Sequence, residues 1–406
     1  TTTDGIYVDG KQTVKGDTTG PMSAQMVLRD PSVDFAVLET ARGGLVRAGL
    51  GYESADVSAC LNVANDHLGM GGIDTLEQLA EVKRVVVEAA TDTVVLNADD
   101  KNCLLMADYT DAEHILYVTM SPEHSLVKQH IKAGGRAVVL EKGMNGDMIT
   151  IYDTGTHIPL VWSHLIPATL EGKALHNVQN AMFAAAMAFS FGKDLDEIRH
   201  GLRTFNTTFF QAPGRMNVFD EHPFRVILDY AHNPAAFAAI TDLVDRLDIT
   251  GKRIVVAACP GDRRDEDIAE AAAVLAGHFD YYICKADDNR RHRGHDEVPQ
   301  MLRKLLIENG VAEENIIIIP EEEDAILAGL EKGEEGDLLV VFGDNVNRSW
   351  KQIIHYGDAD DREKSTDKTE RPITSIAYED LVEEDQQLIS DTRGVRLARD
   401  DVEDGD

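Results

Sequence analysis

Residues 225–234 read RVILDYAHNP, and this stretch decides the fold. The apolar run at 226–228 is typical of a buried parallel strand, and it stops at Asp229. His232 and Asn233 then precede a small-residue helical stretch. Capping of that helix by Asp229 or Asn233 would explain one polar residue but hardly all of them. Since ligands of open α/β sheets bind at the carboxyl ends of strands, the stretch predicts a binding site.

The same pattern recurs through the last third of the chain. From about residue 219 to 357, the apolar runs RVILD, RIVVAA, YYICKA, NIIIIP and DLLVVFG alternate with helical segments. This alternation predicts a doubly wound α/β domain. Charged residues follow four of these strands, at Asp229, 260–264 (PGDRR), 287–291 (DDNRR) and Asp344. Charge after a strand is ordinary, but four such ends on one rim indicate a site.

Residues 34–100 read as a second parallel α/β unit. We expect strands at FAVLET (35–40), which ends in Glu39, and at ADVSACLNV (55–63), which precedes His67. A helix follows, because Thr75 and Gln78 have the spacing of a capping box. Lys83 falls on its apolar face, where a lysine either extends to solvent or points into a site. Glu39, His67 and a modified Lys83 would offer ligands for Mg²⁺ near phosphates.

The alanine-rich helix expected at 175–191 carries polar residues at its start. Asn177 and Asn180 lie three apart and therefore share a face, and an asparagine amide can read an adenine edge with a donor and an acceptor. Ordinary helix-start chemistry is an equal alternative for Asn177, but less so for Asn180. A second helix at 195–204 leads to QAPGRMNVF, which places Arg215 just before the final domain.

Composition limits the partners. The net charge of −33 over 406 residues argues against nucleic acid and anionic membrane surfaces, although a surface suited to salty surroundings has the same composition. We find no membrane-spanning run and no leader segment. The four scattered cysteines indicate a reducing, cytoplasmic compartment. The tail from 358 to 406 has 17 acidic and 7 basic residues, and we expect it to be disordered.

Seven motifs, taken in order, resemble the C-terminal module of the cyanophycin synthetase family. They are LETARGG, NVANDHLG, NADD, HNVQNA, PGRMN, DYAHNP and GDRRDED. That module is itself similar to Mur ligases and folylpolyglutamate synthetases, which share DYAHNP and HNxxN, whereas ETARGG, PGRMN and GDRRDED point to the cyanophycin branch. The resemblance implies an α/β, Mur ligase-like fold. A central P-loop-type ATPase domain would span 1–218, a Rossmann-like domain 219–357, and the tail 358–406.

The resemblance also implies an activity. The family uses ATP and Mg²⁺ to phosphorylate a carboxylate, and an amine then attacks the acyl phosphate. Here the amine would come from L-arginine and the carboxylate from a poly-aspartate (cyanophycin) chain, in a cytoplasmic homo-oligomer. Magnesium and an arginine would neutralise charge during phosphoryl transfer.

The implied roles fall on matching positions of this sequence. Glu39, His67 and Lys83 correspond to the metal site, Asn180 to an adenine contact, Arg215 to the phosphates and Asp229 to the ribose. We expect Asn177 and His232 at the nucleotide as well. We expect the incoming amino acid among Asp262, Arg263, Asp287, Asp288, Arg290 and Arg291, with an aspartate on the guanidinium and an arginine on the α-carboxylate.

One departure is serious. The phosphate-binding GxxGK[ST] loop of the family occurs nowhere in the sequence. We therefore expect an N-terminally truncated fragment that has little activity alone. Two alternatives stay open: a relative that ligates another amino acid, and an inactive Mur-like scaffold that binds polymer.

Overall fold

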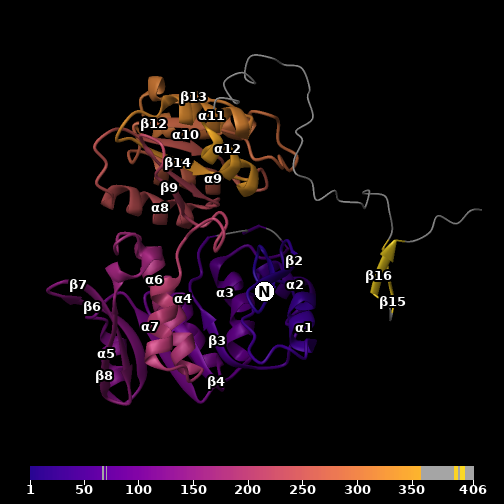
Figure 1. The fold of residues 1–406 in the computed structure, drawn as a ribbon, viewed down its shortest axis with the longest axis vertical. Helices are drawn as coiled ribbons and strands as arrows, with labels where there is room; N and C mark the ends of the chain where they lie inside the picture. Colours follow the sequence, from indigo (N-terminus) through magenta and orange to yellow (C-terminus); the bar gives the residue numbers. More distant parts are fainter. Residues whose placement is uncertain (66–67, 70, 358–387, 392–393, 398–406) are drawn as a thin grey trace, which may run out of the picture. The chain divides into compact units, whose positions relative to one another are not determined.

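The computed structural model describes residues 1–65, 68–69, 71–357, 388–391 and 394–397. The chain separates into two compact units, Thr1–Tyr356 and Gly357–Asp406. The first unit contains two six-stranded sheets, one formed by residues before 163 and the other by residues after 216 (Figure 1). Because both sheets belong to one unit, the predicted boundary at residue 218 stays a prediction. No helix in the described part of the chain is long and apolar enough to cross a membrane.

The first sheet has the strand order β3-β4-β5-β6-β7-β8. Its strands are β3 (Ala55–Cys60), β4 (Ala90–Asn97), β5 (His114–Thr119), β6 (Arg136–Gly143), β7 (Gly146–Asp153) and β8 (Thr156–Trp162). Neighbours from β3 to β6 are parallel, whereas β6, β7 and β8 form an antiparallel meander. The central parallel strands β4, β5 and β6 each contain a buried apolar run, as strands covered on both faces require.

Helices cover this sheet. They are α3 (Leu76–Glu88), α4 (Lys101–Leu105), α5 (Ser125–Lys132), α6 (Leu175–Ser190) and α7 (Leu195–Thr204). The predicted capping box of Thr75 and Gln78 begins α3. Helix α6 contacts β3, β4, β5 and β6, and it buries Met182 and Phe183 against the core. Its alanines permit this close approach, so its polar start is held at the edge of the sheet.

The second sheet has the order β13-β12-β11-β14-β10-β9, and only β9 is antiparallel to its neighbour. The strands are β9 (Asn217–Phe219), β10 (Arg225–Asp229), β11 (Arg253–Ala257), β12 (Tyr281–Cys284), β13 (Ile316–Ile318) and β14 (Leu338–Phe342). The predicted doubly wound arrangement is therefore confirmed.

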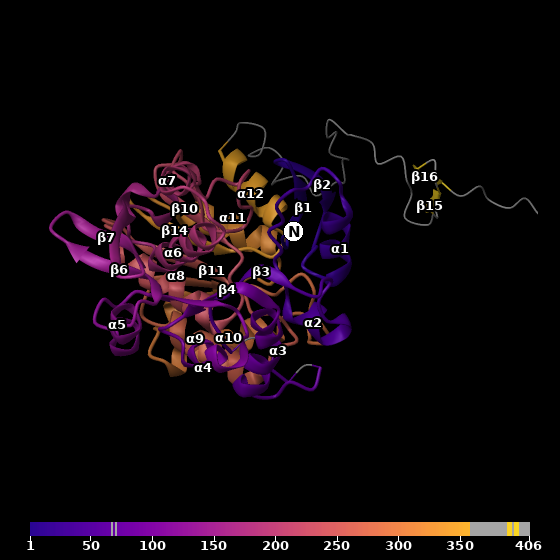
Figure 2. The same ribbon diagram turned by 90° about the horizontal axis from the view of Figure 1, so that it is seen from below.

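Helices pack on both faces of this sheet. On one face lie α8 (Pro234–Arg246), α9 (Asp265–Leu275) and α10 (Glu297–Glu308), and on the other α11 (Glu322–Lys332) and α12 (Val346–His355). Figure 2 shows α9 and α10 on the opposite side of β11 from α11 and α12. Alternate strand residues explain the layers, since Ile227 and Val255 face the first group while Leu228 and Val256 face the second.

The predicted strand at 35–40 is wrong. These residues form no strand, and the segment after them forms helix α2 (Arg42–Ala48). Main-chain bonds join Thr1 N to Val37 O at 2.8 Å and Glu39 N to Thr1 O at 3.2 Å. Such isolated bonds do not make a ladder, so the apolar run lacks the neighbouring strand it needs.

Two hairpins and a short helix lie outside the two large sheets. Strands β1 (Gly5–Val8) and β2 (Lys11–Lys15) pair antiparallel, and α1 (Pro21–Arg29) follows them. In the acidic tail, β15 (Leu388–Asp391) pairs antiparallel with β16 (Gly394–Leu397). The rest of the predicted disordered segment lies outside the described residues.

Candidate nucleotide and amino-acid sites

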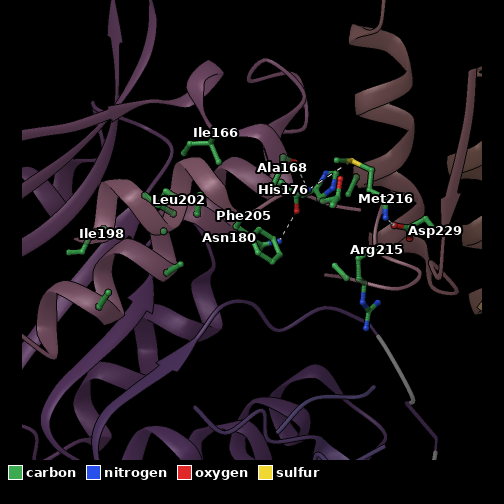
Figure 3. A pocket seen from close by; sticks show the side chains of 18 of the residues that line it. Ile166, Ala168, His176, Asn180, Ile198, Leu202, Phe205, Arg215, Met216 and Asp229 are labelled. Carbon is green, nitrogen blue, oxygen red and sulfur yellow. Dashed lines mark hydrogen bonds between the residues drawn. The ribbon is translucent and has the colours of Figure 1, made fainter. Parts of the chain in front are cut away.

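A cavity of about 900 Å³ lies between helices that cover the first sheet and a helix that covers the second. Helices α6 and α7 form one wall, and residues 212–216, Asp229 and helix α8 form the other. Four residues singled out in the sequence line it together: Asn177, Asn180, Arg215 and Asp229. Figure 3 shows Asn180 on the α6 side and Met216 with Asp229 across from it. We call this space the α6–β10 cavity.

Asp229 is held by main-chain groups at the end of β10. Its Oδ2 accepts a hydrogen bond from Met216 N and its Oδ1 one from Ala231 N, both at 2.8 Å. Burial raises the pKa of Asp229 to about 6, although both N–H donors and the charge of Arg215 favour the ionised form. It does not cap α8, because Asn233 does so by accepting from Ala236 N at 2.9 Å. The main chain therefore fixes the orientation of the Asp229 carboxylate at the wall of the cavity.

The two asparagines of α6 differ in their surroundings. Asn177 donates from Nδ2 to Ala168 O at 2.7 Å, and its Oδ1 accepts from Asn180 Nδ2 at 3.2 Å. Asn180 is exposed, and its Oδ1 has no bond within the described residues. Asn177 thus holds the helix start in place, while Asn180 presents an acceptor to the cavity.

One histidine expected at the cofactor, His232, lies outside the cavity, and another, His176, lines it. His232 does not line the cavity, and its Nδ1 lies 2.9 Å from Tyr230 O. His176 does line the cavity, and its buried Nδ1 has no hydrogen-bond partner within the described residues. Burial lowers the pKa of His176, so its ring is neutral and offers one acceptor. Its position in HNxxN was the signal in the sequence that could have found it.

Of the three predicted metal ligands, the structure describes two, Glu39 and Lys83. Glu39 is exposed and accepts bonds from Thr3 N at 3.1 Å and Thr3 Oγ1 at 2.9 Å. Lys83 Nζ donates to Asn62 O at 2.9 Å, just past β3. His67 lies outside the described residues. Lys83 therefore extends to the carboxyl end of a strand, where the expected site would be.

A different group of possible metal ligands forms elsewhere on the first sheet. Within the described ranges, ligand atoms of Asp92, Glu113 and His114 lie within 4.8 Å of one another. Asp92 and His114 are near the amino ends of β4 and β5, whereas the predicted site belongs to the carboxyl ends. This group was not predicted from the sequence.

The charged strand ends of the second sheet do come together. Arg291 forms an ion pair with Asp262, and Arg263, buried beside them, has Nη1 3.5 Å from Asp262 Oδ1. Arg290 Nη2 lies 3.2 Å from Glu321 Oε1. The loops after β11 and β12 are thus joined by side chains, as their shared rim predicts.

The two aspartates after β12 are not equivalent. Asp288 is bonded through both carboxylate oxygens to Arg348 Nη2, at 2.9 and 2.8 Å. Asp287 accepts only from Asn289 N, at 2.7 Å, within the described residues. Burial and the nearby charge of Asp344 raise the pKa of Asp287 to about 6. Of the two carboxylates, only Asp287 has no ion-pair partner within the described residues.

Beneath this rim lies an ion cluster that the sequence did not reveal. We define it as Lys285, Glu322, Asp344 and Arg348. Lys285 Nζ lies 2.9 Å from both Glu322 Oε2 and Asp344 Oδ2, and Lys285 is fully buried. Burial alone would lower the pKa of Lys285, but the two carboxylates raise it, so the lysine is charged. Burial would likewise raise the pKa of Glu322, yet Lys285 and the N–H of Asp344 lower it to about 2.

Two family models match this chain. The Mur ligase middle domain matches residues 2–188, and the Mur ligase glutamate ligase domain matches residues 214–345. The chain thus consists largely of the middle domain and the glutamate ligase domain of the Mur ligases. Two solved Mur-type structures confirm the fold alone. One is E. coli FolC in complex with DHPP and ADP (TM-score 0.52, 21% identity, covering 76% of this chain and 63% of that one). The other is MurF ligase from Thermotoga maritima in complex with ADP (TM-score 0.52, 16% identity, 79% and 68%).

Among Mur ligase relatives, the cyanophycin synthetases are notably similar. That of Synechocystis sp. is 42% identical over 356 residues, which cover 87% of this chain and 40% of that protein. That of Trichormus variabilis is 42% identical over 87% of this chain and 39% of its own length. A 2,6-diaminopimelate ligase of Corynebacterium efficiens is 29% identical over 83% and 61%. The predicted resemblance is confirmed, and the chain spans about 40% of the length of these synthetases.

Proposed function

We propose that this Mur ligase chain carries the arginine-adding activity of a cyanophycin synthetase. ATP would phosphorylate the side-chain carboxylate of an aspartate in a poly-aspartate chain, releasing ADP. The α-amine of arginine would then attack the acyl carbon, lose a proton and displace phosphate, leaving an amide. The observation that carries the proposal is the 42% identity over 87% of the chain to cyanophycin synthetases, against 29% to a diaminopimelate ligase.

The α6–β10 cavity would hold the nucleoside part of ATP. Its volume of about 900 Å³ lies within the usual range of ligand pockets. Asn180 would accept from the adenine amino group, and Asp229 would accept from ribose hydroxyls. Arg215 is exposed at the mouth, as Figure 3 shows, and would contact phosphate oxygens. Asn177 supports Asn180, while His232 remains beside the cavity with its partner Tyr230.

The residues present fit Mg²⁺ in part. Glu39 is exposed, and its oxygens are hard donors that a cation could take from Thr3. We propose Glu39 and His67 as ligands, with Lys83 contributing only if carbamylated, because an ammonium cannot bind a cation. The ion would supply charge neutralisation during phosphoryl transfer. Since GxxGK[ST] is absent from the sequence, we expect residues 1–406 alone to turn over slowly.

The arginine substrate would enter at the rim of the second sheet. Asp287 is the proposed guanidinium partner, because Asp288 is already paired with Arg348. Among Arg263, Arg290 and Arg291, the last two are held only by exposed or partly exposed carboxylates and could turn to the substrate α-carboxylate. Asp262 would then keep Arg291 near the site. The four cysteines are free and buried, which supports a reducing cytoplasm; a homo-oligomer is proposed from the family resemblance alone.

An ADP-release assay tests the proposal. The protein expressed from its complete gene would be supplied with ATP, Mg²⁺ and a poly-aspartate primer, together with arginine, lysine, 2,6-diaminopimelate or no amino acid. We expect release that needs both arginine and primer, and loss of release in Asp229→Ala. Release with another amino acid alone would reassign the substrate. No release from the folded protein would favour a polymer-binding scaffold.

A further inference from the structure

Lys285 is a fully buried charge that the proposed chemistry does not use. It directly follows β12, and its N–H donates to Ala257 O at 2.9 Å, so its backbone still belongs to the sheet. Its ammonium lies between Glu322 and Asp344, at 2.9 Å from each. Burying the ionised Lys285 and Glu322 beside the partly buried Asp344 is costly, and hydrophobic residues of similar size could fill the same space. Stability alone therefore does not explain why these positions carry charged residues.

The partners of Lys285 hold the loop after β12. Asp344 Oδ2, which accepts from Lys285, also accepts from the main-chain N–H of Asp288 at 3.0 Å. Glu322 Oε1 accepts from Arg348 Nη2 at 2.8 Å, and the same Nη2 contacts both oxygens of Asp288. Loop residue Asp288 is thus tied to the cluster through its backbone and its side chain.

Glu322 connects the cluster to two further elements. It begins α11, and it accepts from Asp344 N at 2.7 Å and from Ser349 Oγ in α12 at 2.8 Å. Asp344 immediately follows Gly343, past β14. The strand ends of β12 and β14 and the starts of α11 and α12 are therefore joined at one buried carboxylate. Movement of any of them would leave a buried charge unpaired.

Ala286 and Asp287 lie between these two fixed points, and Ala286 N is itself bonded to Pro320 O at 3.0 Å. Lys285 holds the chain on one side and Asp288 holds it on the other, so little backbone freedom remains at Asp287. Its carboxylate is half-buried, and its bond to Asn289 N uses only one oxygen. The orientation of the other oxygen follows from the backbone that the cluster fixes.

We propose that Lys285 is a positioning residue that, through Asp344 and Glu322, aims Asp287 at the incoming amino acid. This inference rests on the proposed function, since it assigns the amino acid to the loop at 287–293. Lys285 itself touches no substrate. Its removal should weaken amino-acid binding without changing nucleotide binding, because the α6–β10 cavity contains none of the cluster residues.

The experiment compares three variants of the complete protein. Lys285→Met removes the buried cation, Asp344→Ala removes the acceptor of Asp288 N–H, and Lys304→Met is a control. Lys304 is an exposed lysine on α10 of the same sheet, 3.7 Å from Glu308. Asp344→Ala leaves Lys285 paired with Glu322, so it keeps the test available if Lys285→Met does not fold. Folding is checked by circular dichroism.

Two readouts are taken on each folded variant. Hydrogen exchange of the peptide covering 286–294 should speed up in Lys285→Met and Asp344→Ala, while peptides from β11 and β14 stay protected. The KM for arginine should rise by about tenfold to a hundredfold, as misplacement of a binding group does, while the KM for ATP and the Lys304→Met values stay unchanged. A global loss of stability would not raise the KM for arginine while leaving the KM for ATP unchanged.

The outcomes separate this inference from the proposed function. Unchanged loop exchange, or an unchanged KM for the amino acid in a variant with faster loop exchange, would overturn the role of Lys285. If the wild-type protein uses lysine or diaminopimelate instead of arginine and the variants lose affinity for that amino acid, the positioning role stands and the arginine assignment fails. If no amino acid acts as substrate, the assignment of the loop is overturned, and the inference with it.

Discussion

The carboxyl ends of the two sheets differ sharply in how their polar residues are held. At the second sheet, side chains from four loops form ion pairs, and a buried lysine joins two of those loops. At the first sheet, Glu39 and Lys83 form hydrogen bonds to separate partners, Thr3 and Asn62 O. The strand that would bring Glu39 beside β3 is not formed. Side-chain pairs thus join the loops of the second rim, whereas separate local contacts hold the described residues of the first.

The largest expected effect comes from breaking the second rim. Lys285→Met should lower the free energy of unfolding by about 3–5 kcal/mol, because the buried carboxylate of Glu322 and the partly buried one of Asp344 lose their partner. Urea titration followed by circular dichroism measures the change. Lys83→Met is the matched change at the first rim, and a similar loss there would remove the contrast between the two regions.

Nucleotide affinity tests the α6–β10 cavity. Asp229→Ala should weaken ATP binding by about tenfold to a hundredfold, the loss of roughly 1.5–3 kcal/mol from charged hydrogen bonds to ribose. Isothermal titration of the complete protein gives the value. Asp287→Ala serves as the control, and it should leave ATP affinity unchanged while it weakens arginine binding.

The pH dependence of stability gives a further test of Asp229. Its native pKa of about 6 lies above the value of about 3.9 for an unfolded aspartate. Ionisation therefore costs native-state stability above pH 6, and this cost disappears as the pH falls through 6 toward 4. The free energy of unfolding of the wild type, relative to Asp229→Asn, should therefore rise as the pH is lowered from 7 to 5. A difference that stays flat, or that falls, would contradict the burial of this carboxyl.

The two asparagines of α6 should separate support from recognition. Asn177→Ala removes the bond to Ala168 O and should cost about 1 kcal/mol of stability. Asn180→Ala, at an exposed site, should change stability by no more than about 0.5 kcal/mol but reduce the preference for ATP over GTP. Thermal unfolding and competition binding measure these effects, and equal behaviour of both variants would refute the division.

The smallest effect is expected at the first rim. Lys83→Met removes one hydrogen bond to Asn62 O from a partly buried lysine, so it should cost no more than about 1 kcal/mol. Its effect on turnover should nevertheless be large if Lys83 is carbamylated for metal binding. Addition of bicarbonate should then stimulate the wild type but not the variant.

Much of the fold could be predicted from local patterns. The helix at 195–204, the capping box at Thr75 and all five parallel strands of the second sheet follow from periodicity and turn chemistry. The conformation of the segment at 35–40 could not be predicted in this way, because an apolar run becomes a strand only when a neighbouring strand pairs with it. Its composition is that of a strand, and its surroundings decide otherwise.

The candidate sites could be predicted in part for the same reason. Asn180, Arg215 and Asp229 share one cavity because they lie at element ends that the topology brings together. Lys285 escaped notice because a lysine directly after a strand reads as an exposed rim charge. Its burial depends on Glu322 and Asp344, which lie 37 and 59 residues away in the sequence.

The proposed arginine ligase is tested most directly by its product. The complete protein would be incubated with ATP, Mg²⁺, a short poly-aspartate primer and isotope-labelled arginine, and the primer analysed by tandem mass spectrometry. We predict labelled arginine joined by its α-amine to aspartate side chains, with no incorporation when ATP is omitted. An unmodified primer from a folded protein that binds ATP and arginine would contradict the account.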